Sequence, residues 1–174
     1  MRLFISINFN ELIKNEIISV QNCLKQYARG SFALPENLHL TLVFLGEIAP
    51  SDLEKITITM NKLKVPRMKL VFSHTGNFKR SDGDIWWLGI ENNPSLLNLQ
   101  SRLISELKAS GFKIESRKYQ PHITLARRVK AHKSFSQKDL LAHTFSADVN
   151  KISLMLSQRV SGKLTYTEIC TSGN

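Results

Sequence analysis

The stretch His39-Leu40-Thr41-Leu42 recurs later in the chain as His122-Ile123-Thr124-Leu125, with histidine, apolar residue, threonine and apolar residue in the same order. Alternate side chains of a β-strand point to opposite faces, so each histidine shares a face with its threonine. The apolar residues then enter a core. Each stretch therefore predicts a half-buried strand that presents one imidazole and one hydroxyl.

The elements around these two strands recur in the same order. The histidines at positions 39 and 122 are 83 residues apart, and a shift of 83 aligns much of the first half with the second. The aligned pairs include Phe4 with Trp87, Asn10 with Asn93, and Leu24 with Leu107. We interpret residues 1–174 as one domain with an internal duplication, whose repeats span roughly 2–64 and 85–142. Chance is the alternative, because many α+β chains show such a rhythm and identities outside the histidine stretches are few.

The predicted fold is α+β and bilobal, with two pseudo-symmetric lobes that each hold an antiparallel sheet and helices. The active site would lie in a cleft between the lobes. The first helix is expected over residues 11–29, because apolar residues recur at helical spacing and Gly30 can cap its C-terminal end. A later strand is expected over residues 67–72.

Two imidazoles and two hydroxyls would surround a single phosphate if the lobes bring the two histidine strands together. Histidine has an ordinary pKa of about 6.5, so near neutral pH one copy can act as an acid and the other as a base. Either histidine alone would more often be a surface or hydrogen-bonded structural residue, and the matching second copy favours catalysis. His74, His132 and His143 lack the threonine and fall in turn-like or polar segments, so we expect them to be surface residues.

No metal centre is expected. No acidic residue accompanies either histidine at ligand spacing, whereas a catalytic zinc normally takes three protein ligands. Cys23 and Cys170 lie far apart without the spacing of a zinc or redox motif, and are expected to be packing residues. No Gly-x-Ser-x-Gly motif supports a serine hydrolase.

Charge points to a polyanionic partner. Twenty-four Lys and Arg against fourteen Asp and Glu give a formal net charge of +10, and the second half holds basic clusters at 117–118, 127–130 and Lys133. A solvated basic surface is the simpler alternative. No apolar run of about 18 residues occurs, and the first residues do not read as a signal peptide. We expect a cytoplasmic monomer that acts without a membrane.

With these motifs, the chain resembles the 2′-5′ RNA ligase family, also called RNA 2′,3′-cyclic phosphodiesterases, of the two-histidine phosphoesterase superfamily. The resemblance covers nearly the whole length. Its segments are 1–5, 35–46, 87–89, Gly111-Phe112, Glu115, Arg117, Tyr119, 121–127, and Ser157 with Tyr166. A single histidine motif would be weak, but two copies with these flanks are specific.

The resemblance implies a hydrolase that opens a terminal 2′,3′-cyclic phosphate of RNA to a 2′-phosphate without metal or cofactor, and that has weak ligase activity in reverse. By the same resemblance His39 protonates the departing 3′ oxygen and His122 deprotonates the attacking water. Thr41 and Thr124 would hold the non-bridging oxygens. Arg127 would face the phosphate, where a guanidinium can stabilise developing charge.

The arginine assignment carries an alternative. Strict alternation from His122 places Arg128, rather than Arg127, on the catalytic side of the strand. The family's arginine position therefore requires the strand to bulge or end just after Leu125. We favour Arg127. For either residue, the alternative is a solvated basic face that binds the RNA backbone.

Two other functions fit parts of the pattern. One is an RNA-binding module without catalysis, which intact histidines and threonines argue against. The other keeps the enzyme but changes its substrate to a small cyclic or 2′,5′-linked nucleotide. The motifs describe how a phosphodiester is attacked, whereas the choice of base and RNA length depends on walls that the motifs do not specify.

Overall fold

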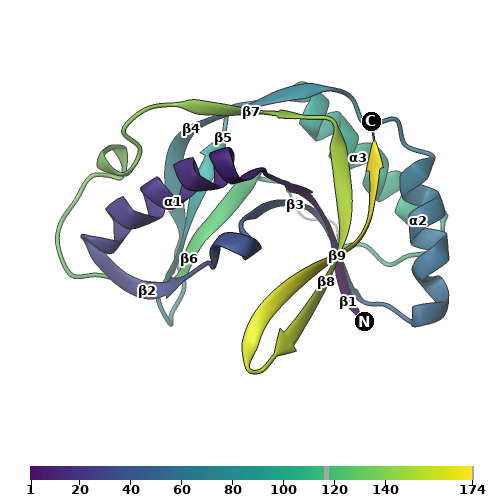
Figure 1. The fold of residues 1–174 in the computed structure, drawn as a ribbon, viewed down its shortest axis with the longest axis horizontal. Helices are drawn as coiled ribbons and strands as arrows, with labels where there is room; N and C mark the ends of the chain where they lie inside the picture. The colour runs from purple at the N-terminus through teal and green to yellow at the C-terminus, as the bar shows by residue number, and fades with distance from the viewer. Residues whose placement is uncertain (116–117, 174) are drawn as a thin grey trace.

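The computed structural model, which describes residues 1–115 and 118–173, consists of two antiparallel sheets and their covering helices (Figure 1). Sheet A has the strand order β3-β1-β8-β9 and sheet B the order β2-β6-β5-β4-β7. The strands are β1 (Arg2–Asn8), β2 (Ala28–Phe32), β3 (His39–Glu47), β4 (Met68–Phe78), β5 (Asp84–Ile90), β6 (His122–Ala131), β7 (Phe145–Val149), β8 (Lys151–Val160) and β9 (Lys163–Gly173). The predicted bilobal α+β class is confirmed. Arg117, part of a predicted basic cluster and of the family resemblance, lies outside the described residues.

Asparagine caps begin the two longest helices. The side chains of Asn10 and Asn93 accept hydrogen bonds from the backbone N–H groups of Ile13 and Leu96, both at 3.0 Å. The helices are α1 (Glu11–Lys25), α2 (Leu53–Asn61) and α3 (Pro94–Ala109), with short 3-10 turns η1 (Pro35–Asn37), η2 (Pro50–Asp52) and η3 (Gln137–Leu140). Within the described part of the chain, no helix has the length and apolar character needed to cross a membrane.

The first helix is shorter than the sequence pattern predicts. It ends at Lys25, and β2 follows where the helix was expected to continue to Arg29. Gly30 is therefore a strand residue and not a helix cap. A Cβ at this position would lie 2.8 Å from Val129 Cγ2, so glycine allows β2 to approach β6 closely. Pairing with a distant strand has overridden the helical spacing.

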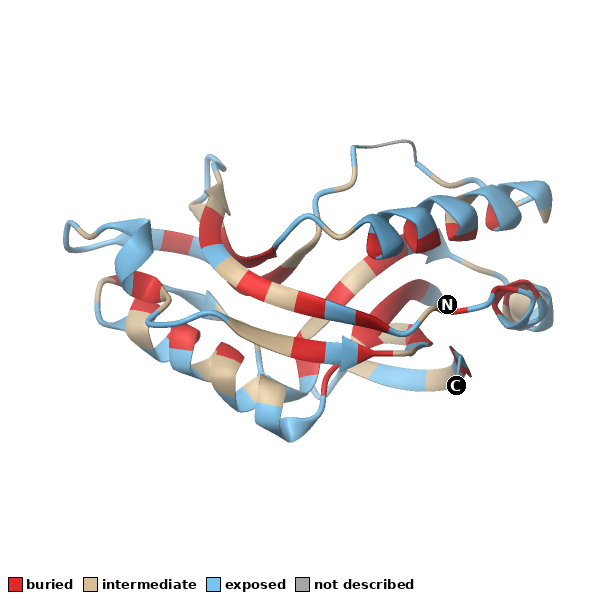
Figure 2. Ribbon diagram, turned by 90° about the horizontal axis from the view of Figure 1, so that it is seen from above, coloured by how far each residue is buried: buried red, intermediate tan, exposed pale blue. Residues whose placement is uncertain are grey.

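Each long helix covers the sheet that does not hold its preceding strand. Helix α1 follows β1 of sheet A but packs against β2, β6 and β7 of sheet B, whereas α3 follows β5 of sheet B and packs against β3 of sheet A. The buried residues of the helices lie on the side toward the sheets (Figure 2). This exchange joins the two lobes through one continuous hydrophobic core.

The two halves present their elements in parallel order. Strand, helix and histidine strand occur as β1, α1 and β3 in the first half and as β5, α3 and β6 in the second. The sheet orders β3-β1-β8-β9 and β6-β5-β4-β7 correspond strand by strand, with β2 added to sheet B. An internal duplication within one domain remains our interpretation of this order.

Candidate active site

The first histidine is fixed by the backbone just before its own strand. His39 Nδ1 lies 2.7 Å from the carbonyl oxygen of Asn37, and the Asn37 side chain donates to the Leu164 carbonyl at 2.8 Å. Because Nδ1–H donates to a carbonyl, Nε2 is the nitrogen left for proton transfer. His39 Nε2 lies 2.9 Å from Thr41 Oγ1, so the threonine hydroxyl and the imidazole lie side by side in the same site.

The second histidine has the same attachment. His122 Nδ1 lies 2.7 Å from the carbonyl oxygen of Gln120, so Nε2 is again the nitrogen left for proton transfer. In both strands the histidine and threonine are half-buried while the residue after each is buried, as strand alternation predicts. Thr124 therefore lies on the same face as His122, and its cross-strand partner is Trp87 on β5.

Aromatic rings pack against both imidazoles. Tyr166 meets His39 edge-on at 5.1 Å between ring centroids, and Phe78 meets His122 edge-on at 5.2 Å. Phe4 lies at 4.8 Å from His39 and Trp87 at 6.1 Å from His122. These rings restrict each imidazole and remove water from around it.

Burial lowers the pKa of both histidines, and the charge of Arg127 lowers each of them further. The charge of His122 also lowers the pKa of His39, so the two imidazoles and the guanidinium act on one another across the lobes. The hydrogen bonds to the Asn37 and Gln120 carbonyls oppose these effects by favouring the charged form. The net effect lowers both pKa values and so favours the neutral form of both imidazoles.

A β-bulge in β6 directs Arg127 toward the face that carries His122. Along β5, Trp87 lies opposite Thr124 and Trp86 opposite Ala126, so Leu125 is the extra residue of β6. The bulge shifts the alternation by one residue and brings Arg127 to the face of His122. Arg128 takes a left-handed conformation with φ 52° and donates to Ser31 Oγ at 2.9 Å. The bulge that Arg127 requires is thus present, and Arg128 is directed to β2.

Strand β3 carries a matching bulge. Along β1, Ser6 lies opposite Thr41 and Ile5 opposite Val43, so Leu42 is the extra residue. The same shift brings Phe44, whose exposed fraction is 69%, to the face of His39 and Thr41. Phe44 occupies the position in the first motif that Arg127 occupies in the second.

Buried glutamines from the helices hold both bulges. Gln21 of α1 donates to the Leu125 carbonyl at 2.8 Å, and Gln100 of α3 donates to the Leu42 carbonyl at 3.4 Å. The Leu125 carbonyl also accepts from the backbone N–H of Ala33 at 2.9 Å, so Gln21 is its second donor and adds to the backbone bond at the bulge. Each helix therefore supports the bulge of the sheet that it covers.

Tyr119 connects the two histidine strands. It lies shortly before β6, and its hydroxyl donates to the Thr41 carbonyl of β3 at 3.0 Å. Burial raises the pKa of its hydroxyl well above the ordinary value, so it serves as a neutral donor. This bond fixes the separation of the two motifs.

Comparisons with known proteins identify the family of this chain. A family model described as the 2′-5′ RNA ligase superfamily matches residues 13–160. The RNA 2′,3′-cyclic phosphodiesterase of Thermotoga maritima is 34% identical over 73% of this chain and 70% of its own length. The chain belongs to the 2′-5′ RNA ligase superfamily.

Other members of this superfamily match over nearly the full length. The RNA 2′,3′-cyclic phosphodiesterase of Escherichia coli K12 is 28% identical over 97% of this chain and 93% of its own length. A crystal structure of E. coli LigT complexed with 3′-AMP superposes with a TM-score of 0.83 at 27% identity, covering 98% of this chain and 95% of that one. The fold of this chain therefore matches that of LigT over nearly its whole length.

A third histidine lies on the catalytic face of sheet B, which the motif analysis missed. Strand β4 continues to Phe78 instead of ending near residue 72, and His74 pairs with Gly89, which pairs in turn with His122. The His74 ring occupies the space that a Cβ at Gly89 would fill and meets Trp87 edge-on at 5.8 Å. His74 is exposed as expected, but it is not a turn residue.

The remaining histidines and cysteines lie elsewhere. His143 pairs with Glu16 of α1 at 3.3 Å, and His132 is exposed beyond the end of β6. Cys23 and Cys170 are both free. Among the residues that the structure describes, no three His, Cys, Asp or Glu side chains gather as a metal site would require.

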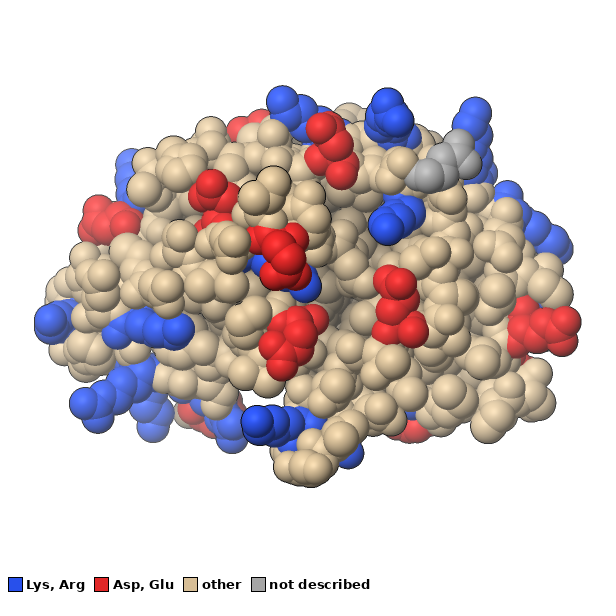
Figure 3. Space-filling view, in the orientation of Figure 1, with Lys and Arg blue, Asp and Glu red and all other residues tan. Residues whose placement is uncertain are grey.

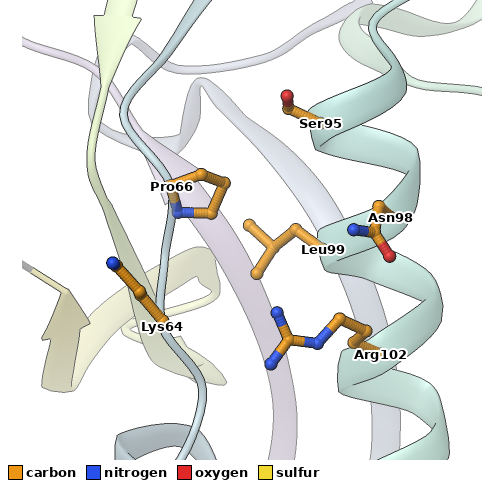
Figure 4. Close-up of a pocket in the computed structure, with 6 residues that line it drawn as sticks. All are labelled: Lys64, Pro66, Ser95, Asn98, Leu99 and Arg102. Atoms are coloured by element: carbon orange, nitrogen blue, oxygen red, sulfur yellow. The ribbon is translucent and has the colours of Figure 1, made fainter.

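A cavity of about 190 Å³ lies between α3 and the segment that leads into β4 (Figure 4). Its lining residues are Lys64, Pro66, Ser95, Asn98, Leu99 and Arg102. Helix α3 covers the face of sheet A opposite to His39, because Gln100 reaches Leu42 from that side. This cavity is therefore separate from the catalytic face.

Positive charge is not gathered in one patch on the face shown in Figure 3. Lys and Arg side chains lie mostly around its rim, whereas several Asp and Glu side chains lie nearer its centre. On this face, attraction for a polyanion therefore depends on the net charge of +10 and on local basic groups more than on a continuous basic surface.

Proposed function

We propose that this protein is an RNA 2′,3′-cyclic phosphodiesterase that opens a terminal 2′,3′-cyclic phosphate to a 2′-phosphate. The observation that carries the proposal is the pair of imidazoles, each with Nδ1 fixed on a backbone carbonyl so that Nε2 is the nitrogen left for proton transfer, both influenced by one guanidinium. The names of the relatives support the substrate class.

Each proton in the proposed reaction has a place. His122 Nε2 takes a proton from water as the water oxygen attacks phosphorus. The bond from phosphorus to the 3′ oxygen breaks, and the protonated Nε2 of His39 gives its proton to that oxygen. The product is a 2′-phosphate with a free 3′ hydroxyl. A 5′ hydroxyl in place of water would attack the cyclic phosphate in the same way: His122 takes its proton, the bond to the 3′ oxygen breaks, His39 protonates that oxygen, and a 2′-5′ phosphodiester forms, which is a weak 2′-5′ ligase activity. In the reverse of this step, from the 2′-5′ diester back to the cyclic phosphate, the histidines exchange roles.

Neutral and cationic donors surround the phosphate in this scheme. Thr41 and Thr124 donate hydroxyl hydrogen bonds to the non-bridging oxygens, and Arg127 stabilises the charge that builds on them. The bulge in β6 supports Arg127 over Arg128 in this role. Phe44 and Tyr166 offer rings near His39 against which a base can stack.

The decisive experiment combines a substrate with a chelator. The purified protein is incubated in EDTA with an oligonucleotide that ends in a 2′,3′-cyclic phosphate, and the position of the product phosphate is mapped. We expect full activity and a 2′-phosphate. Loss of activity in EDTA with recovery on adding zinc or manganese would contradict the metal-independent mechanism, and a 3′-phosphate product would contradict the assignment of the leaving oxygen.

A cytoplasmic monomer completes the proposal. Both cysteines are free, as is usual in a reducing compartment, and one chain supplies both histidines and Arg127. A second copy is not needed to build the site. Light scattering of the purified protein at several concentrations should give a constant mass near 19.8 kDa.

A further inference from the structure

A carboxylate lies on the same face of sheet A as the first histidine. Tyr166 and Glu168 are two positions apart on β9 and point to the same side of the sheet. Tyr166 is the residue whose ring meets His39 edge-on at 5.1 Å. Glu168 therefore belongs to the surface over which a substrate bound at His39 would extend.

Hydrogen bonds fix the direction of this carboxylate. Asn8 Nδ2 donates to Glu168 Oε2 at 3.0 Å, and Ser6 Oγ donates to Asn8 Oδ1 at 3.1 Å. Ser6 is fully buried, and Asn8 is the direct cross-strand neighbour of His39. The Glu168 side chain is exposed, so its other lone pairs face outward and can accept hydrogen bonds from a ligand.

The chemistry of the carboxylate limits what it can bind. A carboxylate repels phosphate, so Glu168 cannot be a second phosphate ligand. It accepts hydrogen bonds from N–H groups, and among bases cytosine presents an amino group at position 4 where uracil presents a carbonyl oxygen. The ribose that carries the cyclic phosphate also carries the terminal base, which must therefore lie within one nucleotide of His39.

We propose that Glu168, held by Asn8, forms a base-reading subsite that accepts a hydrogen bond from the amino group of the terminal base and disfavours uracil. The inference rests on the proposed function, because it places the base relative to the phosphate bound at His39. A uracil at this subsite would set its carbonyl oxygen against the carboxylate, leaving both acceptors without a donor. The discrimination therefore combines a favourable contact with an unfavourable one.

The test compares two oligonucleotides of the same sequence that end in cytidine or uridine 2′,3′-cyclic phosphate. For the wild-type protein we expect kcat/KM to be about tenfold higher for the cytidine end, as one well-placed base contact provides. Glu168→Gln should bring the ratio close to one, since an amide can turn to donate or accept. Asn8→Ser should lower the ratio by freeing the carboxylate. Glu54→Gln, which removes an exposed carboxylate from α2 on the helix-covered side of sheet A, is the matched control and should keep the wild-type ratio.

The outcomes separate this inference from the function on which it rests. Equal hydrolysis of both ends by the wild-type protein, or an unchanged ratio in Glu168→Gln, would overturn the subsite and leave the phosphodiesterase standing. Failure of the wild-type protein to open either end would overturn the proposed function itself. Circular dichroism of each variant confirms its fold, and Asn8→Ser gives an independent measurement if Glu168→Gln does not fold.

Discussion

Strands β3 and β6 are built alike as far as their bulges and differ in the residue that each bulge presents. Both begin with a histidine fixed at Nδ1 by a carbonyl, continue with a threonine, and bulge at a leucine held by a buried glutamine. The bulge of β3 then presents Phe44, whereas that of β6 presents Arg127. One scaffold thus supplies an apolar ring on one side of the site and a cation on the other.

The surroundings of the two imidazoles do not account for their different proposed roles. Each has one ring edge-on, from Tyr166 or Phe78, and each has a pKa lowered first by burial and next by Arg127. The charge of His122 lowers the pKa of His39 further, which does not by itself favour His39 as the proton donor. The acid and base roles therefore depend on where the substrate places its leaving oxygen and its attacking water. An enzyme of this symmetry can run the reaction in either direction by exchanging the roles.

Removal of either imidazole should have the largest effect. His39→Ala and His122→Ala are each expected to lower the single-turnover rate by about 10²- to 10⁴-fold, because one positioned proton-transfer group contributes that much. Circular dichroism controls for folding, and His143→Ala, on the outer side of α1, is the matched control. A folded variant of either histidine with a near-wild-type rate would contradict the assignment of that histidine to proton transfer.

Arg127→Gln should follow, with a loss of about 10²- to 10³-fold in kcat/KM, since it removes a charged donor from the developing oxyanion. Arg128→Gln removes the same charge one residue away and should change kcat/KM little, because Arg128 is directed to Ser31. Similar losses in both variants would mean that the bulge does not select between the arginines.

The pH profile adds a signature that a loss of fold would not produce. A reaction that needs one neutral and one protonated imidazole gives a bell-shaped kcat/KM, with limbs that belong to the coupled pair. Arg127 lowers the pKa of both histidines, so its removal raises both. The base then becomes neutral only at higher pH and the acid keeps its proton to higher pH, so both limbs of the Arg127→Gln profile should move toward alkali. A profile displaced toward acid would contradict this.

Much of this geometry follows from local pattern, and the failures share a physical cause. The alternation at His39 and His122 and the caps at Asn10 and Asn93 are fixed by neighbouring residues, and the structure has the strands and helix starts where they predict. The boundary of α1 was wrong because β2 is stabilised by β6, about a hundred residues further on in the sequence.

The catalytic face itself was harder to predict. The bulge in β6 is supported by hydrogen-bond donors from other elements, such as Gln21 of α1. Strand periodicity therefore identified Arg127 and Arg128 as the two candidates but could not distinguish between them. The place of His74 depends on Gly89, whose missing side chain leaves room for the imidazole. From the sequence alone, a glycine in a strand indicates only a low intrinsic preference for β-structure. That Gly89 leaves space for the His74 ring becomes visible only when β4, β5 and β6 are paired.

The glutamines offer a finer comparison of the two strands. Gln21→Leu and Gln100→Leu each leave a buried bulge carbonyl with one donor fewer, and each should destabilise the fold by about 1 to 3 kcal/mol. Only Gln21 supports the bulge that presents Arg127, so Gln21→Leu should also lower kcat by roughly tenfold at a temperature where the protein stays folded, while Gln100→Leu should not. Thermal unfolding and kcat are measured on the same samples. Equal kcat losses would show that the bulges do not act separately.

The smallest expected effect concerns His74, the third imidazole, which lies on sheet B and has no counterpart on sheet A. His74 lies on the same face of sheet B as His122, and Gly89 of β5 lies between the two histidines. We therefore expect His74 to contact RNA upstream of the cyclic phosphate without taking part in proton transfer. His74→Ala removes one exposed hydrogen-bonding group, which contributes about 0.5 to 1.5 kcal/mol, or roughly three- to tenfold in affinity. The loss should fall on KM for an oligonucleotide and leave kcat unchanged, and a cyclic mononucleotide should show no change in either constant. An equal rise of KM for both substrates would place His74 at the terminal nucleotide, and a fall in kcat would give it a part in the chemistry that the two-histidine mechanism does not assign.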